Sequence, residues 1–197
     1  DSESEVLRQR VRDFVADNQH HMPQPNSDFV TGHDAEFSAK LGAKGWIGMT
    51  WPTQYGGAEQ SNFERLVVTE ELLAAGAPVS AHWIADRQSG PLLLRFGTPE
   101  QRQRYLPGIA SGQSYFSIGM SEPDTGSDLA SVRTTAVAEG DAYRINGTKI
   151  WTTDAHRNHY IICLVRTEAP SENRHAGFSQ IIVDLKNDGA KVRPISN

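Results

Sequence analysis

An acidic segment rich in glycine and serine, residues 117–128, has the composition of a ligand-binding loop. Its sequence is Ser-Ile-Gly-Met-Ser-Glu-Pro-Asp-Thr-Gly-Ser-Asp. Because glycine permits close approach, such a loop can place backbone N–H groups and small hydroxyls against a phosphate or the polar edge of a ligand. Pro123, Asp124 and Gly126 are equally typical of a plain turn. Taken alone, the segment leaves both interpretations open.

A second segment, residues 146–155, carries an indole and two hydroxyls directly after a predicted hairpin. Asn146-Gly147 favours a two-residue loop in which both central residues have positive φ. The run from Lys149 to Thr153 is expected to form the next strand, with Trp151 and Thr152 on it. Tryptophan is usually a buried hydrophobe with one donor, so core packing is the alternative for Trp151.

Histidine and cysteine give little sign of further chemistry. His82, His156, His159 and His175 lack the paired short spacing of zinc ligands, so we expect no metal site. Cys163 is the only cysteine and lies in an apolar run, which predicts a buried, unreactive thiol.

The first half of the chain has the apolar spacing of helices. We expect helices near the N-terminus, at about residues 34–44, at 61–76 and at 80–96, the last broken at Gly90-Pro91 because proline cannot donate to the preceding turn. Ser61 with Glu64 and Thr98 with Gln101 are capping boxes, and each predicts the start of a helix.

From Gln113 onward the pattern changes to short runs rich in β-forming residues. Glu139-Gly140-Asp141 predicts a hairpin turn. Helices followed by an antiparallel β domain favour an α+β fold, with domains at 1–112 and 113–197. We expect the second domain to be incomplete at its last strand. The expected strands are 114–120, 132–138, 143–146, 149–153, 159–166, 178–185 and 191–195.

Composition limits the classes of partner. With 197 residues, 38% hydrophobic and 22% charged, the chain is typical of a soluble globular protein. The net charge is −5 and the basic residues are scattered along the chain, so the sequence shows no basic patch of the kind that binds nucleic acid. No apolar run is long enough for a membrane span, and the acidic start is unlike a targeting peptide. We expect a cytoplasmic protein, with the mitochondrial matrix as the alternative.

Together the two segments resemble the acyl-CoA dehydrogenase family. Its middle domain carries a Thr-Glu-Pro-x-x-Gly-Ser-Asp loop and, after an Asn-Gly-x-Lys hairpin, a Trp-Ile-Thr strand. Residues 45–57, 96–102 and 105–112 are also similar to the N-terminal domain of the family, so the resemblance covers essentially the whole chain. Two departures stand out: Ser121 replaces the usual threonine, and Thr152 replaces the usual isoleucine.

The resemblance implies a fold and a cofactor site. The fold is an N-terminal all-α domain followed by a β-barrel-like middle domain, truncated before the C-terminal four-helix domain. The cofactor is FAD, with Thr153 near flavin N5 and Ser127 where FAD and acyl-CoA both pass. The implied FAD-binding residues are Ile118, Met120, Ser121, Gly126, Ser127, Trp151, Thr152 and Thr153.

The implied reaction is α,β-dehydrogenation of an acyl-CoA thioester in lipid or fatty-acid metabolism. Hydride passes to flavin N5 and electrons pass to electron-transfer flavoprotein, in an enzyme expected to be a homodimer or homotetramer. No residue of this chain corresponds to the catalytic base, so the chain alone is expected to be inactive. The alternatives are a flavin oxidase or monooxygenase on the same scaffold, or a noncatalytic partner subunit or module.

Overall fold

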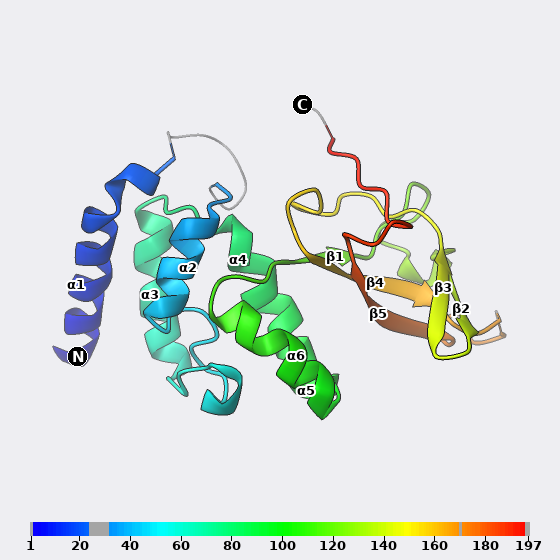
Figure 1. The fold of residues 1–197 in the computed structure, drawn as a ribbon, viewed down its shortest axis with the longest axis horizontal. Coiled ribbons are helices and arrows are strands. Elements are labelled where there is room, and N and C mark those ends of the chain that lie inside the picture. The colour runs from blue at the N-terminus through cyan, green and yellow to red at the C-terminus, as the bar shows by residue number, and fades with distance from the viewer. Residues whose placement is uncertain (1, 24–31, 170, 196–197) are drawn as a thin grey trace. The chain divides into compact units, whose positions relative to one another are not determined.

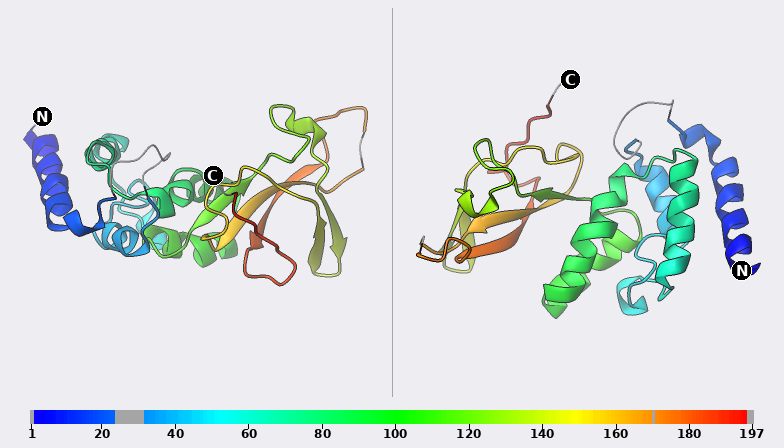
Figure 2. Two further views of the ribbon diagram at one scale, coloured as in Figure 1. Left: turned by 90° about the horizontal axis from the view of Figure 1, so that it is seen from above. Right: turned by 180° about the vertical axis from the view of Figure 1, so that it is seen from behind.

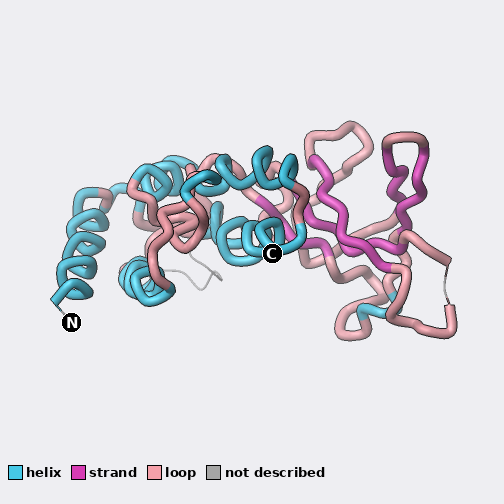
Figure 3. Tube along the Cα trace, turned by 90° about the horizontal axis from the view of Figure 1, so that it is seen from below, coloured by secondary structure: helices cyan, strands magenta, loops and turns pink. Residues whose placement is uncertain are grey.

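The chain forms two compact units. The computed structural model describes residues 2–23, 32–169 and 171–195, and it divides at Tyr115 and Phe116. The long helices belong to the first unit and the strands to the second (Figure 3). The predicted α+β class, helices before strands, is confirmed. No helix within the described ranges combines the length and apolar character that crossing a membrane requires.

Local capping signals set the helix starts in the first unit. Ser61 and Thr98 accept from the N–H groups of Glu64 and Gln101, and both capping boxes are complete, as predicted. The helices are α1 (Ser2–Asp17), α2 (Ala35–Ala43), α3 (Asn62–Ala74), α4 (Ser80–Ile84), α5 (Gly90–Phe96) and α6 (Pro99–Ala110) (Figure 1).

The core of the first unit draws on most of these helices. Phe37 and Leu41 of α2, Val67 of α3 and Leu106 of α6 are fully or almost fully buried. Helix α1 packs along α3 (Figure 2). At the edge of this contact Arg8 of α1 forms an ion pair with Glu71 of α3, with 2.7 Å between Nη1 and Oε1. Burial of apolar surface therefore holds the helices together, with the ion pair at its edge.

The predicted break at Gly90-Pro91 is wrong. Residues 80–96 form one continuous helical run, in which a π-helical turn, Ala85–Ser89, joins α4 to α5. The N–H of Gly90 donates to the carbonyl of Ala85, five residues back. Pro91 lies in the first turn of α5, directly after the π turn. The regular i→i−4 hydrogen bonds are already interrupted there, so the N–H that proline lacks does not end the helical run.

The π turn is packed against the loop between α2 and α3. Asp86 Oδ1 accepts from the backbone N–H of Gly48 at 2.8 Å. The ring of Trp51 lies so close to Gly90 that an added Cβ would overlap its Cη2 and Cζ2 atoms. Gly90 is therefore required for close approach of this ring rather than for a break in the helix.

The second unit is a mixed five-stranded sheet. Strand β4 pairs antiparallel with β5 along its length, and parallel with β1 over residues 160–163. Strands β2 and β3 form a hairpin, and Thr135 of β2 pairs with Arg166 at the end of β4. The strands are β1 (Phe116–Gly119), β2 (Thr135–Glu139), β3 (Ala142–Asn146), β4 (Tyr160–Arg166) and β5 (Phe178–Asp184).

Several strand predictions need correction. The sheet is open and not wholly antiparallel, because the chain returns from β3 to place β4 parallel to β1. Residues 149–153 and 191–195 are not strands. The hairpin at Gly140 is confirmed, with φ of +65°. Asn146-Gly147 makes no hairpin, and Gly147 instead allows close contact with Thr134, where a Cβ would overlap the threonine side chain.

The sheet has its own apolar core. Ala136, Ile161, Cys163 and Val165 are buried, and Ile181 of β5 packs against them. Burial raises the pKa of the Cys163 thiol to about 11. The predicted burial of Cys163 is therefore confirmed, and the raised pKa disfavours the thiolate, which is the reactive form of the thiol.

The contact between Trp51 and Gly90 predicts a coupled pair of substitutions. We expect Gly90→Ala to lower the free energy of unfolding by about 1–3 kcal/mol, the usual cost of overpacking. In a Trp51→Phe background, Gly90→Ala should lower the free energy of unfolding by less, because phenylalanine lacks the two ring carbons that the added methyl would meet. Urea unfolding of the four proteins measures this, and equal costs in both backgrounds would contradict the contact.

Candidate functional site

The structure brings the two chemically notable segments together. The first runs from the end of β1 through residues 120–128, and the second occupies residues 147–158 between β3 and β4 (Figure 1). The backbone N–H of Ile150 donates to the carbonyl of Ser121 at 3.0 Å. Segments about thirty residues apart in sequence thus form one surface of the second unit.

A buried ion pair joins these segments. Lys149 Nζ lies 2.9 Å from Glu122 Oε1, and the two side chains are only 8% and 7% exposed. The same ammonium donates to the carbonyl of Met120 at 3.0 Å. One lysine of the second segment therefore fixes both the backbone and the carboxylate of the first.

Glu122 is also tied to the start of β2. Its carboxylate accepts from the backbone N–H groups of Arg133 and Thr134 at 2.8 and 2.9 Å, and from the Thr134 hydroxyl. Burial raises the pKa of Glu122, but the hydrogen bonds from Thr134, Arg133 and Lys149 outweigh it and lower the pKa to about 2. The group is thus a fixed anion and a poor proton acceptor.

A second network holds the far end of the 147–158 segment. Ser117 Oγ donates to the carbonyl of Thr153 at 2.8 Å. Asn158 Nδ2 donates to Ser117 Oγ at 2.8 Å and to the carbonyl of Phe116 at 3.0 Å. Strand β1 therefore positions the backbone of residues 153–158, although these residues form no strand themselves.

Between these anchors lies the most exposed large aromatic residue of the unit. Trp151 is 71% exposed and its φ is +58°, which is unusual for a bulky side chain. The alternative that Trp151 packs in the core is wrong. Thr152 Oγ1 is buried and has no hydrogen-bond partner among the described residues, while Thr153 is exposed.

The remaining predicted site residues fall into two groups. Ile118, Met120 and Ser121 are half-buried in the chain that leads to Glu122, whereas Gly126 and Ser127 are exposed in the turn beyond it. The turn is closed by paired backbone bonds between Glu122 and Thr125. Within the described ranges no hydrogen bond or ion pair joins Gly126 or Ser127 to residues 151–153.

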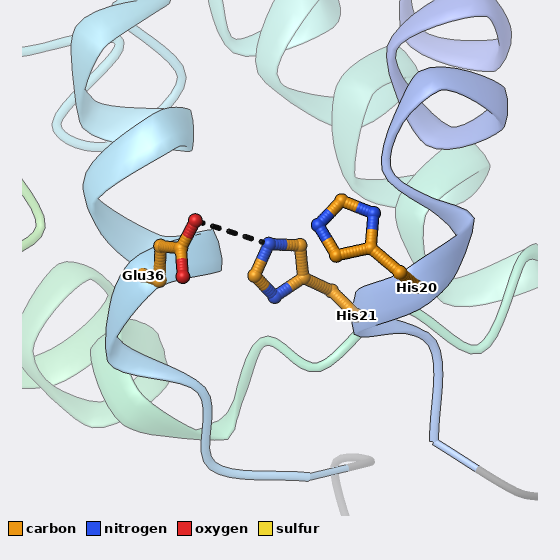
Figure 4. A group of neighbouring side chains, drawn as sticks. All are labelled: His20, His21 and Glu36. Atoms are coloured by element: carbon orange, nitrogen blue, oxygen red, sulfur yellow. Dashed lines mark ion pairs between the residues drawn. The ribbon is translucent and has the colours of Figure 1, made fainter.

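One group of described side chains has the spacing of metal ligands: His20, His21 and Glu36, in the first unit (Figure 4). Two of these side chains already contact a cation, because Lys40 Nζ lies 2.9 Å from His21 Nε2 and 3.1 Å from Glu36 Oε1. His21 Nδ1 lies 2.7 Å from Asp34 Oδ2. Both ring nitrogens of His21 are engaged, so His21 links the 3₁₀ turn Gln19–His21 to α2 through polar contacts.

The depressed pKa of Glu122 predicts how acid destabilises the protein. A carboxyl with a pKa of about 2 in the folded state and an ordinary value of 4.5 stabilises the fold above pH 4.5, and the contribution disappears as the pH falls to about 2. Glu122→Gln should therefore be less stable by about 3 kcal/mol at pH 7 and nearly equal to the parent at pH 2.

Urea titrations across this pH range measure the difference. Asp124→Asn is the matched control, because Asp124 is an exposed acid of the same loop with a 3.7 Å ion pair. A constant deficit for Glu122→Gln at every pH would contradict the assignment of a buried, charged Glu122.

Comparison with known proteins agrees with the fold and the paired segments. Residues 1–113 match the acyl-CoA dehydrogenase N-terminal domain, and residues 117–197 match the acyl-CoA dehydrogenase middle domain. The chain is 35% identical to acyl-CoA dehydrogenase FadE26 of Mycobacterium tuberculosis over 201 residues, covering 98% of this chain and 50% of the relative.

Solved structures give the same result. The Tcur3481-Tcur3483 steroid ACAD superposes with a TM-score of 0.82 at 35% identity, covering 96% of this chain and 49% of that one. For the ChsE4-ChsE5 complex from Mycobacterium tuberculosis the TM-score is 0.80 at 37% identity, covering 94% and 47%. The chain spans about half the length of the curated relatives it matches. By its two matching domains, the chain belongs to the acyl-CoA dehydrogenase family.

Proposed function

We propose that this chain forms the flavin-binding part of an FAD-dependent acyl-CoA dehydrogenase. The observation that carries the proposal is the surface on which the buried Glu122–Lys149 pair holds Ser121 beside residues 150–153. In this assignment residues 1–112 are the N-terminal helical domain and residues 113–197 the middle β domain.

The residues present fit a flat aromatic ligand with polar edges. Trp151 offers an exposed indole, and Thr152 has a hydroxyl that lacks a partner. Gly126 has open space where a side chain would be. A buried polar group without a partner is costly, so a ligand or water at Thr152 would relieve it. These features favour FAD as the ligand of the surface.

When bound, FAD supplies the hydride acceptor for α,β-dehydrogenation of an acyl-CoA thioester. We assign to Trp151 the exclusion of water beside the isoalloxazine ring and to Thr153 a position near N5. Ser121 supplies a hydroxyl donor at the pyrimidine edge, and Ser127 lies where FAD and acyl-CoA both pass. The charge of Lys149 is paired with Glu122, so neutral donors face the ring.

The catalytic base is assigned to residues outside these 197. Glu122 is the nearest buried carboxylate, but it accepts four hydrogen bonds and its pKa is about 2. Asp128 accepts from Arg174 at 2.7 Å. Neither carboxylate is free to take the weakly acidic α proton of a thioester.

The names of similar proteins suggest a substrate class and an assembly. Two structures at 35% and 36% identity are named steroid ACADs, and another is a complex of two named chains. We therefore include acyl groups with a steroid nucleus among the proposed thioesters. We also propose assembly with another acyl-CoA dehydrogenase chain, identical or different, and electron-transfer flavoprotein as the electron acceptor.

Replacing Trp151 tests the flavin surface. In the full-length protein, Trp151→Ala should weaken FAD binding by roughly 3- to 10-fold, because stacking area beside the ring is lost. Trp151→Phe should retain much of the affinity. Tyr143→Ala is the control, since Tyr143 is an aromatic residue of the same unit that is 55% exposed on β3. Flavin content after gel filtration and FAD titration give the affinities, and equal values for Trp151→Ala and the parent would contradict the placement.

The assignment of the base gives a second test. The 197-residue chain mixed anaerobically with FAD and a panel of acyl-CoA thioesters should not bleach the flavin, because loss of a positioned base typically costs about 10²–10⁴-fold in rate. A full-length family member serves as the positive control. Bleaching by this chain at a comparable rate would place the base within residues 1–197.

A further inference from the structure

Residues 152–158 form a tight loop that leads into β4. The backbone N–H groups of Arg157 and Asn158 donate to the carbonyl of Asp154 at 2.8 and 3.0 Å. Asp154 has a φ of +54°, in the left-handed region that non-glycine residues adopt only sparingly. The carbonyl of Thr153, directly before this turn, is held from outside the loop, by a side chain of β1.

Two buried side chains connect that carbonyl to the sheet. Ser117 of β1 is fully buried, and Asn158 is 8% exposed. Asn158 Nδ2 donates to Ser117 Oγ at 2.8 Å, and Ser117 Oγ donates to the carbonyl of Thr153 at 2.8 Å. We call this chain of hydrogen bonds, from Asn158 through Ser117 to Thr153, the relay. Its first two members lie on or beside β1 and β4, which are paired with each other.

The chemistry of the groups fixes the direction of the relay. A serine hydroxyl has one hydrogen, and a carbonyl oxygen can only accept. Because the Asn158 amide donates into Ser117 Oγ, the hydroxyl hydrogen is left for the carbonyl of Thr153. Asn158 Nδ2 also donates to the carbonyl of Phe116 at 3.0 Å, so flipping the amide would set two acceptors against each other. A buried polar chain of this kind specifies one arrangement of the backbone.

Stability alone does not explain the presence of Asn158. Its Oδ1 atom is sealed inside the protein and has no hydrogen-bond partner in the part of the chain that the structure describes. A buried acceptor without a donor lowers the stability of the fold, and an apolar side chain would fill the space without that loss. The position that Asn158 imposes on Thr153 is therefore the better explanation of this side chain.

We infer that Asn158 and Ser117 are positioning residues of the flavin site. They hold the backbone that carries Thr153, whose exposed side chain is assigned the place near flavin N5. This inference rests on the proposed function and deepens it, because neither side chain of the relay touches the cofactor or the thioester in that assignment. A misplacement of about 1 Å can slow a reaction about 100-fold, so the relay governs the rate of flavin reduction and not the affinity for FAD.

Single substitutions in the full-length protein test the relay. Ser117→Ala and Asn158→Ala should each slow flavin reduction about 10-fold, because the backbone of Thr153 is no longer fixed. The rate is measured anaerobically with the thioester of an acyl-CoA panel that reduces the parent fastest. FAD affinity and the half-saturating thioester concentration should change by less than about 2-fold. The visible spectrum of the bound flavin should shift in both variants.

A double variant distinguishes a relay from two independent contacts. If Asn158 acts through Ser117, Asn158→Ala should slow reduction by less than about 2-fold further in a Ser117→Ala background. Ser117→Thr keeps the hydroxyl and should restore most of the rate and the spectrum of the parent. Ser179→Ala is the matched control, because it removes a serine hydroxyl of the same sheet that is bonded to Thr167 at 2.9 Å and not to the relay.

Three results would overturn the relay. They are a parental rate and spectrum in Ser117→Ala and Asn158→Ala, independent effects that multiply in the double variant, and an equal loss in Ser179→Ala. A parallel loss of FAD affinity and rate would also overturn it, since the pair would then only stabilise the loop. Should Asn158→Ala fail to fold, the comparison of Ser117→Ala with Ser117→Thr decides. A parent that binds no FAD contradicts the flavin proposal itself, so the two failures are distinguishable.

Discussion

The arrangement of the second unit depends on one buried charge pair, Glu122 with Lys149. Removing two charges from water is expensive, and the cost is recovered only where the geometry is good and the remaining donors and acceptors are satisfied. Here Lys149 meets a carboxylate and a carbonyl, and Glu122 meets both backbone and hydroxyl donors of the β2 start. The loop after β1, the residues before β2 and the segment around Lys149 thereby meet at one point. They are joined there by side-chain contacts and not by strand pairing.

The sequence predicts features that depend on near neighbours. The capping boxes at Ser61 and Thr98 and the turn at Gly140 involve residues within a few positions, and the structure agrees with all three. The predicted strand at 149–153 fails because its geometry is decided elsewhere, by Glu122 and by Ser117. The signal that sequence reasoning missed was an acid and a lysine within the two motifs, and that pairing becomes evident only once the motifs are placed together.

Trp151 shows why part of the site could not be inferred from residue type. Its motif identified the position, but tryptophan is ordinarily buried and ordinarily has negative φ, and here neither holds. A non-glycine residue in this conformation costs about 1–3 kcal/mol unless its surroundings impose it. The anchors on both sides, at Lys149 and at Thr153, supply that constraint. The backbone that carries the exposed indole is therefore held in place before any ligand arrives.

The π turn at Ala85–Ser89 has a consequence for the evolution of chain length in this unit. Such a turn accommodates one residue more than an α-helix would over the same rise, so α4 and α5 keep their positions despite the insertion. Deleting a single residue of this turn, such as Gln88, would restore the α-type hydrogen bonds while α4 and α5 keep their relative rotation. Deleting a residue of α4 instead would rotate α5 by about 100° about the helix axis and turn Gly90 away from Trp51. Within this helical run, the π turn is therefore the place that best accommodates the loss of one residue.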